Sequence, residues 1–438
     1  MQGFRASHPV VSRFSQLLLG RIVMQALYRC IAGMDVHRML YVVTILVELA
    51  DGTEEKHQRS FGGFKRDRRA LVAWLVELGV ELVVMESTGI YWKSIYSTLE
   101  KAGIPAHVVN ARHVKNVPGR KTDLSDSEWL ARLGRYGLVK PSFIPPEDLR
   151  ELRVVSRYRD KVAQTLAGEK NRLHKVLDDA GIKLGAVVSD IHGVSAQAMI
   201  DGLIDGTPIE QLPDLAKGTL REKHELLELS LDGELTPRHL FVLKNIREHI
   251  RYLESELASL DAYLIDAMAP YADYWRFLQT LPGLDQISAA MILVEIGTDL
   301  KAFDNVRHFA SWAALCPGNH ESAGKRKTGR IRKGNHMIRH LLCEAANAAR
   351  RTNSVFRSFY QSLVPRKGHK KAIVAVAHKL LRTIYMLFTR RQAYRDPGID
   401  YQAMVVNRNA PRWIRALKKY GFWPKISTLN APIAAPVH

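Results

Sequence analysis

The chain has 438 residues, of which 64 are Lys or Arg and 44 are Asp or Glu, so its formal net charge is +20. This length predicts about two to three domains, and a hydrophobic share of 46% excludes a disordered chain. So large a positive excess is costly through self-repulsion unless a polyanion compensates it, which makes nucleic acid the first partner to consider.

Cysteine content and hydropathy bound the compartment in which the chain works. The three cysteines, Cys30, Cys316 and Cys343, are too few and too scattered for a disulfide framework or a zinc ribbon, which favours a reducing compartment. The most apolar run, 41–49, is shorter than the roughly 18 residues that a membrane helix needs. We therefore expect a cytoplasmic protein without membrane contact. Residues 1–28 are expected to be a flexible extension. One interpretation is that translation starts at Met24 and that the residues before it are not part of the protein.

Residues 29–145 alternate between strand and helix patterns. Strand-like runs at 31–35, 39–49 and 56–61 are followed by a helical pattern at 71–78, a strand at 82–85, a helix at 91–100 and a strand at 106–109. Tight turns can join the first three strands as an antiparallel meander, whereas the later strands need crossover helices. This order predicts a mixed α/β layered domain.

Residues 146–270 read as almost entirely helical. Thr236-Pro237 is a helix start signal, a hydroxyl N-cap followed by proline at the first helical position. From there apolar residues recur alternately three and four positions apart, at Leu243, Ile246, Ile250, Leu253, Leu257, Leu260 and Leu264. Two interpretations stay open: an ordinary helix packed in its own domain, or a coiled coil formed with the helix near 149–177 or between the chains of a dimer.

A second compact, mainly helical unit is expected over 271–395, and a loose tail with five prolines over 396–438. Leu281-Pro282-Gly283-Leu284 followed by a helical 287–296 resembles a helix-hairpin-helix element, whose glycine turn lets backbone N–H groups approach a phosphate. A plain helix-turn-helix corner is the alternative. Residues 325–351 contain nine Lys or Arg against one acidic residue, Glu344, and this density favours phosphate contact over a solvated face.

Acidic residues at strand ends point to metal-dependent chemistry. Phosphoryl transfer on DNA commonly uses two divalent cations held by carboxylates, and Mg²⁺ prefers oxygen ligands. Asp35 closes the first strand and Glu86 the fourth, and a central first strand would place them side by side. Asp123 and Asp126, spaced i, i+3 at a helix start, share one face. Taken alone, Asp123 would be interpreted as a helix N-cap and Glu86 as a partner of a helix dipole. Taken together in this order of elements, the four acidic residues predict a site for Mg²⁺, with Mn²⁺ as the other candidate.

Three segments carry a family resemblance: 33–37 (Gly-Met-Asp-Val-His), 85–89 (Met-Glu-Ser-Thr-Gly) and 121–126 (Lys-Thr-Asp-Leu-Ser-Asp). They resemble the DEDD signature of insertion-sequence transposases whose N-terminal domain is like the RuvC Holliday-junction resolvase, a ribonuclease-H-like fold. The family is the one-ten family of insertion sequences, also called bridge-RNA-guided recombinases. Residues 281–284, 316–325 and 329–334 are similar to the family's C-terminal transposase domain. The two matches cover roughly residues 30–140 and 275–390.

The resemblance implies a RuvC-like DEDD catalytic domain over 29–145, a helical linker or coiled coil over 146–270, and a transposase domain over 271–395. It also implies that Ser322 attacks a DNA phosphodiester and forms a phosphoserine link. Basic side chains near Ser322 would stabilise the transition-state charge. The residues expected to contact nucleic acid are Lys121, Gly283, Lys325, Arg326, Lys327, Arg330, Arg332 and Lys333.

The partners that the resemblance implies are donor and target DNA, a structured noncoding guide RNA, and further copies of the chain, as a dimer or tetramer through the helical segment. The compartment is then the bacterial cytosol, with the protein associated with the nucleoid. If base pairing selects the site, the protein needs only shape and phosphate contacts.

The leading interpretation is therefore a DNA transposase of a mobile element. One alternative is a RuvC-like junction nuclease that uses metal-activated water and leaves Ser322 idle, and another is a noncatalytic nucleic-acid-binding protein. Zinc binding by His336, His340 and Cys343 is not favoured because no fourth ligand accompanies them. Tyr91-Trp92 fit packing better than base stacking.

Overall fold

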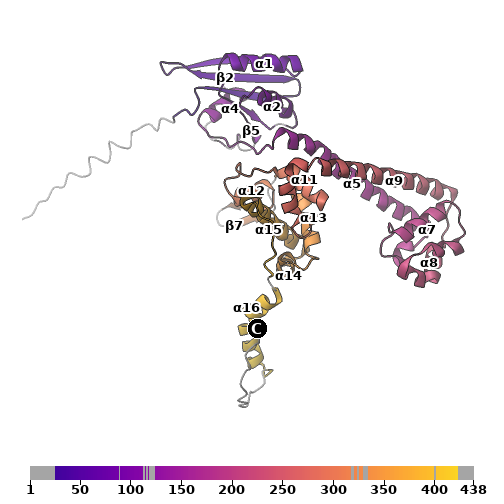
Figure 1. Cartoon of the computed structure of the whole chain (residues 1–438). Helices are drawn as coiled ribbons and strands as arrows, with labels where there is room; N and C mark the ends of the chain where they lie inside the picture. The colour runs from indigo at the N-terminus through magenta and orange to yellow at the C-terminus, as the bar shows by residue number, and fades with distance from the viewer. Residues whose placement is uncertain are drawn as a thin grey trace, which may run out of the picture. The chain divides into compact units, whose positions relative to one another are not determined.

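The structure, a computed structural model, describes residues 25–87, 89–111, 114, 117, 124–316, 320–322, 325–328, 334–398 and 401–422. The chain divides into two compact units, Met1–Ile144 and Pro145–His438 (Figure 1).

The first unit is built on a five-stranded mixed sheet. Its strands are β1 (Cys30–Val36), β2 (Leu40–Glu48), β3 (Glu54–Gly62), β4 (Leu82–Glu86) and β5 (Ala106–Val109), and its helices include α1 (Lys65–Glu77), α2 (Trp92–Lys101) and α4 (Asp126–Arg135). The strand order is β3-β2-β1-β4-β5, with β1–β2 and β2–β3 antiparallel and β1–β4 and β4–β5 parallel. The predicted meander, crossovers and central first strand are confirmed, and they give the sheet of a ribonuclease-H-like fold.

Both faces of this sheet are covered, because successive side chains of a strand point to opposite faces. On one face Ala32 and Met34 of β1 join a core that includes Leu75 of α1 and Leu99 of α2. On the other face Ile31 joins the core that α4 contributes to. The two cores explain why β1 is apolar almost throughout, as expected for a central strand buried on both faces.

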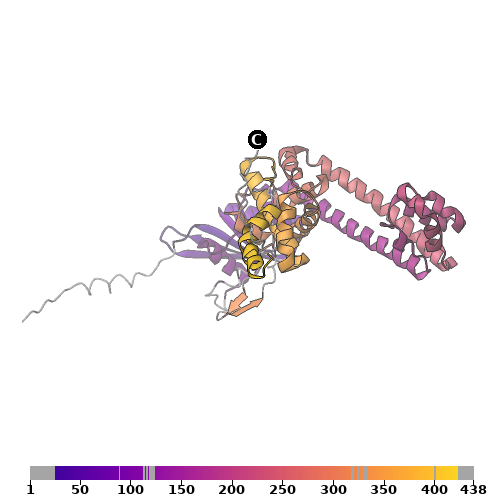
Figure 2. The ribbon, with the colours of Figure 1, turned by 90° about the horizontal axis from the view of Figure 1, so that it is seen from below.

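The second unit begins with two long helices, α5 (Glu147–Asp179) and α9 (Pro237–Asp266), which run side by side in Figures 1 and 2. The predicted start of α9 is confirmed, since the Thr236 hydroxyl accepts a hydrogen bond from the His239 N–H at 3.3 Å. The apolar seam of α9 packs against α5 of the same chain. The buried members of this shared core include Leu243, Ile250 and Leu253 of α9 and Val162, Leu166 and Leu173 of α5.

Short helices connect α5 to α9 at the far end of this pair. They are α6 (Leu184–Val187), α7 (Val194–Ile204), the 3-10 helices η1 (Ile209–Leu215) and η2 (Gly218–Lys223), and α8 (His224–Leu231). Arg247 of α9 ties this end together with a bidentate ion pair to Asp201 of α7, at 2.6 and 3.0 Å.

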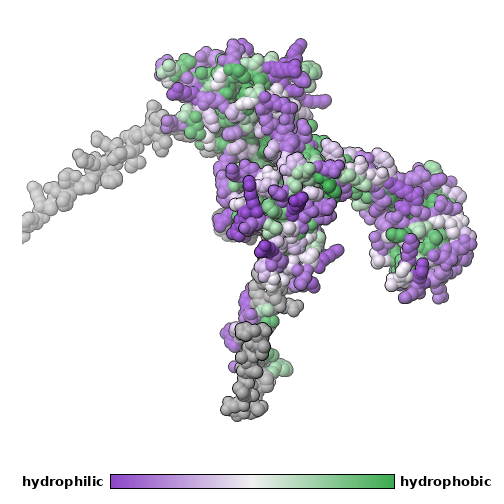
Figure 3. Space-filling model, in the orientation of Figure 1, coloured by the Kyte–Doolittle hydropathy of each residue, from purple (hydrophilic) through white to green (hydrophobic). Residues whose placement is uncertain are grey.

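The rest of the second unit is mainly helical. Its elements are η3 (Ala269–Tyr271), α10 (Ala272–Gln279), α11 (Gln286–Ile296), α12 (Val306–Trp312), β6 (His320–Ser322), β7 (Lys325–Thr328), α13 (His336–Ala349), α14 (Val355–Lys367), α15 (His369–Arg390) and α16 (Tyr401–Lys419). Hydrophilic side chains cover much of its visible surface (Figure 3).

Helix α15 is long and apolar enough to cross a membrane by length and composition, a feature that the sequence analysis did not single out. Its apolar side, including Val376, Leu380 and Ile384, is buried, and α13 and α14 pack against it. This is the pattern of a core helix, and half of the apolar window is buried inside the protein.

The expectation of a loose tail is wrong for residues 401–419, which form α16. The prediction counted five prolines over the whole tail, but only Pro411 falls within the residues that form α16. Trp413, Leu417 and Tyr420 recur at helical spacing between basic residues, which is an amphipathic helix pattern. The last three prolines, at 424, 432 and 436, lie outside the described residues.

Candidate active site

Asp35 and Glu86 are neighbours at the carboxyl ends of two parallel strands. The β1–β4 register pairs Met34 with Met85, so Asp35 and Glu86 are the next residues along each strand. Because side chains alternate, Asp35 shares a face with Ile31, and Glu86 shares a face with Val84. Ile31 and Val84 both belong to the core on the α4 side, so both carboxylates lie on that side of the sheet.

Helix α4 brings a third acid to the same end. A Cβ on Gly33 would lie 1.9 Å from the carbonyl oxygen of Ser127, so the first turn of α4 rests directly on β1. At the other end of α4, a Cβ on Gly134, its last residue but one, would lie 2.6 Å from the side chain of Val84 and 2.8 Å from that of Ile31. The helix therefore runs antiparallel to β1, and its first residue, Asp126, lies toward the carboxyl end of that strand.

The start of α4 is fixed by hydroxyl groups. Ser125 is the N-cap and accepts a hydrogen bond from the Glu128 N–H at 3.2 Å. The hydroxyls of Ser127 and Thr44, a buried residue of β2, are 2.8 Å apart. These contacts hold the helix N-terminus over β1 and β2, and with it the Asp126 backbone.

The fourth predicted acid, Asp123, and the basic Lys121 lie outside the described residues. Within the described part of the chain, no group of three or more His, Cys, Asp and Glu side chains is arranged to hold a metal ion. The Asp35 carboxylate accepts a hydrogen bond from His37, whose Nε2 is 3.0 Å from the Asp35 Oδ2. His37 stands in the quoted motif, but sequence analysis gave it no role.

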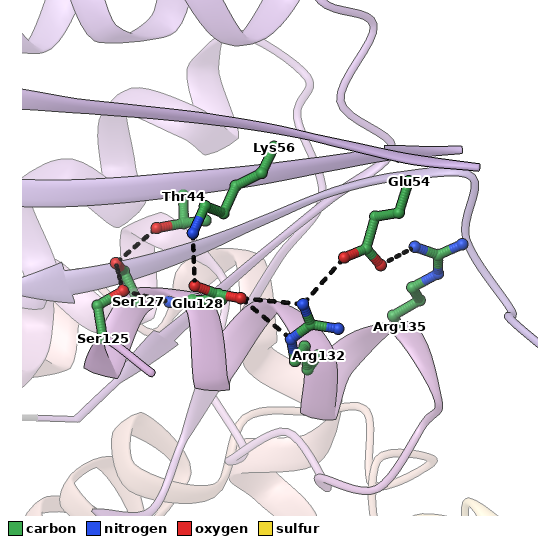
Figure 4. Close-up of polar contacts among 8 residues, drawn as sticks. All are labelled: Thr44, Glu54, Lys56, Ser125, Ser127, Glu128, Arg132 and Arg135. Carbon is green, nitrogen blue, oxygen red and sulfur yellow. Dashed lines mark hydrogen bonds and ion pairs between the residues drawn. The ribbon is translucent and has the colours of Figure 1, made fainter. Parts of the chain in front are cut away.

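A chain of alternating charges, also missed from the sequence, clamps α4 to β2 and β3 (Figure 4). It runs from Lys56 to Glu128 at 3.0 Å, from Glu128 to Arg132 at 2.9 Å and from Arg132 to Glu54 at 3.0 Å. Arg135 extends it by ion pairs to Glu54 and Glu48, at 2.5 and 2.6 Å. The available signal was the i, i+4 pair Glu128 and Arg132 on a helix facing charged residues of a strand.

Ser322, the predicted nucleophile, is the last residue of β6, which forms a two-stranded hairpin with β7. The register pairs Ser322 with Lys325, so Ser322 stands beside the hairpin turn. Arg326 and Lys327 follow in β7, while Arg330, Arg332 and Lys333 lie outside the described residues. The segment between α12 and α13 is closed at its base, where the Asn335 N–H donates to the Trp312 carbonyl at 2.9 Å.

A fully buried carboxylate supports the base of this hairpin segment. Glu295 of α11 accepts two hydrogen bonds from Arg157 of α5, at 2.9 and 3.2 Å, and one from the Asn335 side chain at 2.7 Å. Asn335 in turn caps α13 by accepting from the Met337 and Ile338 N–H groups. Arg153 of α5 approaches Glu295 at 3.3 Å; burial lowers the pKa of Arg153 to about 10 despite this carboxylate, which leaves it charged at neutral pH.

Two family models match the chain in the regions of these two sites. A DEDD transposase model of the IS110 type matches residues 32–182, and the model described as "Transposase IS116/IS110/IS902 family" matches residues 276–361. Together they span just over half of the chain, in the order in which the sequence motifs occur. The chain belongs to this family of insertion-sequence transposases.

The transposase is similar to named relatives over most of its length. It is 25% identical to the transposase for insertion sequence element IS1111A of Coxiella burnetii, over 76% of this chain and 84% of that protein. It is 26% identical to a family 20 transposase of Pseudomonas aeruginosa, over 72% of this chain and 86% of that protein.

Among solved structures, Thermus thermophilus RuvC overlaps 26% of this chain and 99% of its own, at 14% identity and a TM-score of 0.20. RuvC in complex with a Holliday junction substrate overlaps 26% of this chain at a TM-score of 0.21. The strand order and directions of the sheet, and the family match, carry the assignment of the ribonuclease-H-like fold to the transposase.

Gly283 has a packing reason to be glycine. Its φ is +86°, and a Cβ there would lie 2.4 Å from the Ala345 carbonyl oxygen and 2.6 Å from the Ala349 nitrogen of α13. The turn between α10 and α11 is therefore pressed against the backbone of α13. Phosphate contact by this turn stays a prediction.

The sequence Tyr91-Trp92 was expected to serve packing. Trp92 packs beside Tyr96 against the core of the first unit, whereas Tyr91 is exposed.

The charge chain beneath α4 should make the stability of the first unit depend on acid pH. Burial raises the pKa of Glu128, but hydrogen bonds and charges from Lys56 and Arg132 outweigh it, so its pKa lies below the usual range. A carboxyl whose folded-state pKa is depressed contributes stability above its unfolded pKa and loses it as pH falls through the folded value. Glu128→Gln should therefore destabilise the transposase at pH 7 and converge with the parent in acid.

Urea denaturation at a series of pH values checks this. Glu55→Gln, which removes a half-exposed carboxylate of β3, is the matched control and should change the unfolding free energy by at most about 1 kcal/mol. A Glu128→Gln deficit that stayed constant below pH 4 would contradict the assignment.

Removing the buried Glu295 carboxylate should destabilise the second unit. Glu295→Ala leaves Arg153 and Arg157 without their shared partner, a change that costs about 3–5 kcal/mol for a buried pair. Glu254→Ala serves as the control. Glu254 of α9 also pairs with a cation of α5, Lys170, but its side chain is more than a third exposed. We expect the control to cost about 1 kcal/mol or less. Equal urea midpoints for the two variants would show that Glu295 is not a support of the hairpin base.

Proposed function

We propose that this transposase cuts and rejoins DNA through a divalent-metal site at Asp35, Glu86, Asp123 and Asp126 and through Ser322 as nucleophile. The observation that carries the proposal is the adjacency of Asp35 and Glu86 in register, on the face and at the end where α4 begins with Asp126.

The donor set fits a hard cation. All four candidates are carboxylates, and Mg²⁺ or Mn²⁺ takes oxygen ligands of this kind. When bound, such an ion neutralises phosphate charge and lowers the pKa of a coordinated hydroxyl. The chain contributes the placement of the carboxylates: β1 and β4 set two of them in register, and the charge chain of Glu128 and Arg132 holds α4 in place beneath the third.

Ser322 would carry the strand during exchange. Its Oγ forms a bond to phosphorus and loses its proton, while the bond to a deoxyribose oxygen breaks and that oxygen leaves as a hydroxyl. The phosphoserine keeps the energy of a phosphodiester, so attack by a second deoxyribose hydroxyl rejoins a strand and releases Ser322. Support comes from the sequence Lys325-Arg326-Lys327 directly across the turn from Ser322. Such cations stabilise charge that develops on the phosphorus oxygens.

The partners of this reaction are donor and target DNA, with a structured noncoding RNA selecting the sites by base pairing. The net charge of +20 supports a polyanionic partner of either kind. Further copies of the chain, joined through the helical segment, would supply the second active site that an exchange of strands needs. The reaction would take place in the cytoplasm, on the nucleoid.

Copurification tests the guided mechanism. Nucleic acid extracted from the purified transposase and sequenced should contain one discrete structured RNA encoded beside its gene. Strand exchange on donor and target DNA should require this RNA, stop on addition of EDTA and resume with excess Mg²⁺ or Mn²⁺. Full exchange after RNase treatment would contradict the guide, and full exchange in EDTA would contradict the metal site.

A further inference from the structure

The second unit contains a cavity that is separate from the candidate site residues. It has a volume of about 440 Å³ and lies between α10, the segment after α11 and the end of α15. This volume is in the range of about 300–1,000 Å³ that small-ligand sites occupy. We propose that it binds an unpaired nucleotide, with the base against aromatic side chains and the phosphate against two cations.

Aromatic rings form one side of the cavity. Tyr274, Tyr385 and Phe388 line it, and the rings of Tyr274 and Phe388 are 4.9 Å apart at an interplanar angle of 62°. Phe388 is buried and Tyr274 and Tyr385 are half-buried, so the tyrosines combine a packed position with access from the cavity. Nucleobases stack on such rings whatever their sequence.

Charged side chains form the other part of the lining. Two are cations, Lys301 and Arg391, and one is the carboxylate of Asp299. Across the described part of the chain, neither has a carboxylate within ion-pair distance, so both charges remain available to an anion. The Lys301 backbone is held by its N–H, which donates to the Asp299 carboxylate at 2.9 Å. Aromatic rings beside unpaired cations suit a base with its phosphate better than a purely apolar ligand.

The backbone conformation of Arg391 is a further indication of a ligand at this cavity. Arg391 ends α15 in the left-handed region, with φ 50° and ψ 49°, and the next N–H, of Gln392, closes the turn by donating to the Leu387 carbonyl at 3.2 Å. Helices commonly place glycine at such a terminal position of positive φ. In this chain α11 and α14 end on Gly297 and Gly368, at φ 68° and 73° with an extended ψ. Among the described non-glycine residues, Ala314 alone shares a positive φ with Arg391. Strained residues of this kind cluster at ligand-binding sites, and Arg391 stands in the lining of this cavity.

The inference rests on the assignment as a DNA transposase, but not on the metal site or on Ser322. A paired base presents only its edges, so a base that stacks in a cavity must be unpaired, as in a single strand or a flipped nucleotide. Such a nucleotide could come from a DNA strand or from a guide RNA, and the chemistry recognised is the same in both.

The test uses the full-length protein and a fluorescent single-stranded oligonucleotide, as DNA and as RNA of one sequence, in EDTA so that no strand chemistry occurs. Arg391→Gly removes the cation and also the backbone strain. It should therefore keep or raise the Tm while weakening single-strand binding roughly tenfold. Arg390→Ala removes the same charge from the neighbouring exposed residue and should bind like the parent.

A second pair of variants tests stacking. Tyr385→Phe should keep the affinity, and Tyr385→Ala should lose roughly tenfold. The larger loss on DNA or on RNA identifies the source of the nucleotide. Equal single-strand affinities of Arg391→Gly and Arg390→Ala would overturn the proposal, as would an equal loss on blunt duplex DNA.

Discussion

Replacing Ser322 by alanine should eliminate the covalent protein–DNA adduct and reduce strand exchange by a factor on the order of 10⁴ or more, as loss of a nucleophile does in other enzymes. DNA binding should persist, because the basic residues of the unit are unchanged. Ser322 ends β6 beside the hairpin turn, so the loss of its hydroxyl leaves the β6–β7 pairing intact. The measurement is a denaturing gel of labelled DNA trapped during the reaction.

Thr328→Ala is the matched control, since Thr328 is a hydroxyl residue of β7 in the same hairpin, paired with His320. It should form the adduct at the parental rate. Strand cleavage by Ser322→Ala at the parental rate would instead support the junction nuclease, in which metal-activated water attacks and Ser322 is idle.

The fold of the first unit could be predicted because its signals are local. Short strand-like runs between turns marked the strands, and the spacing of Leu71, Trp74 and Leu75 marked α1. Short turns then required antiparallel neighbours and long connections required crossovers, which left β1 in the centre. Helix α16 was missed because prolines counted over the whole tail hid a stretch interrupted only by Pro411.

The candidate acids could be predicted for the same reason, since Asp35 and Glu86 each end a recognisable strand. Their supporting side chains could not. Lys56 and Glu128 are separated by 72 residues, and Arg157 and Glu295 by 138, so no local pattern connects the partners. The packing of α4 on the sheet and of α5 on α11 decides which charged side chains meet. A single sequence does not show how these elements are aligned with one another.

Asp35→Asn and Glu86→Gln should each reduce metal-dependent strand cleavage by a factor on the order of a thousand, because each amide replaces a charged oxygen ligand with a neutral group. Both changes keep size and shape, and the Asp35 position can still bond to His37, so the Tm should remain near that of the parent. Cleavage of labelled DNA across a titration of Mn²⁺ measures the effect. Asp51→Asn in the β2–β3 turn, whose carboxylate accepts from Thr53, is the control and should cleave normally.

Mixing variants separates two ways in which the acids and Ser322 could cooperate. If one chain's Ser322 works with a partner's carboxylates, an equimolar mixture of Asp35→Asn and Ser322→Ala chains should regain adduct formation, because some pairings unite an intact acid site with an intact serine. If each chain uses its own pair, the mixture should stay as inactive as its components. Parental cleavage by Asp35→Asn alone would remove the acid site from the reaction, and the cleavage would then have to come from a different site of the chain.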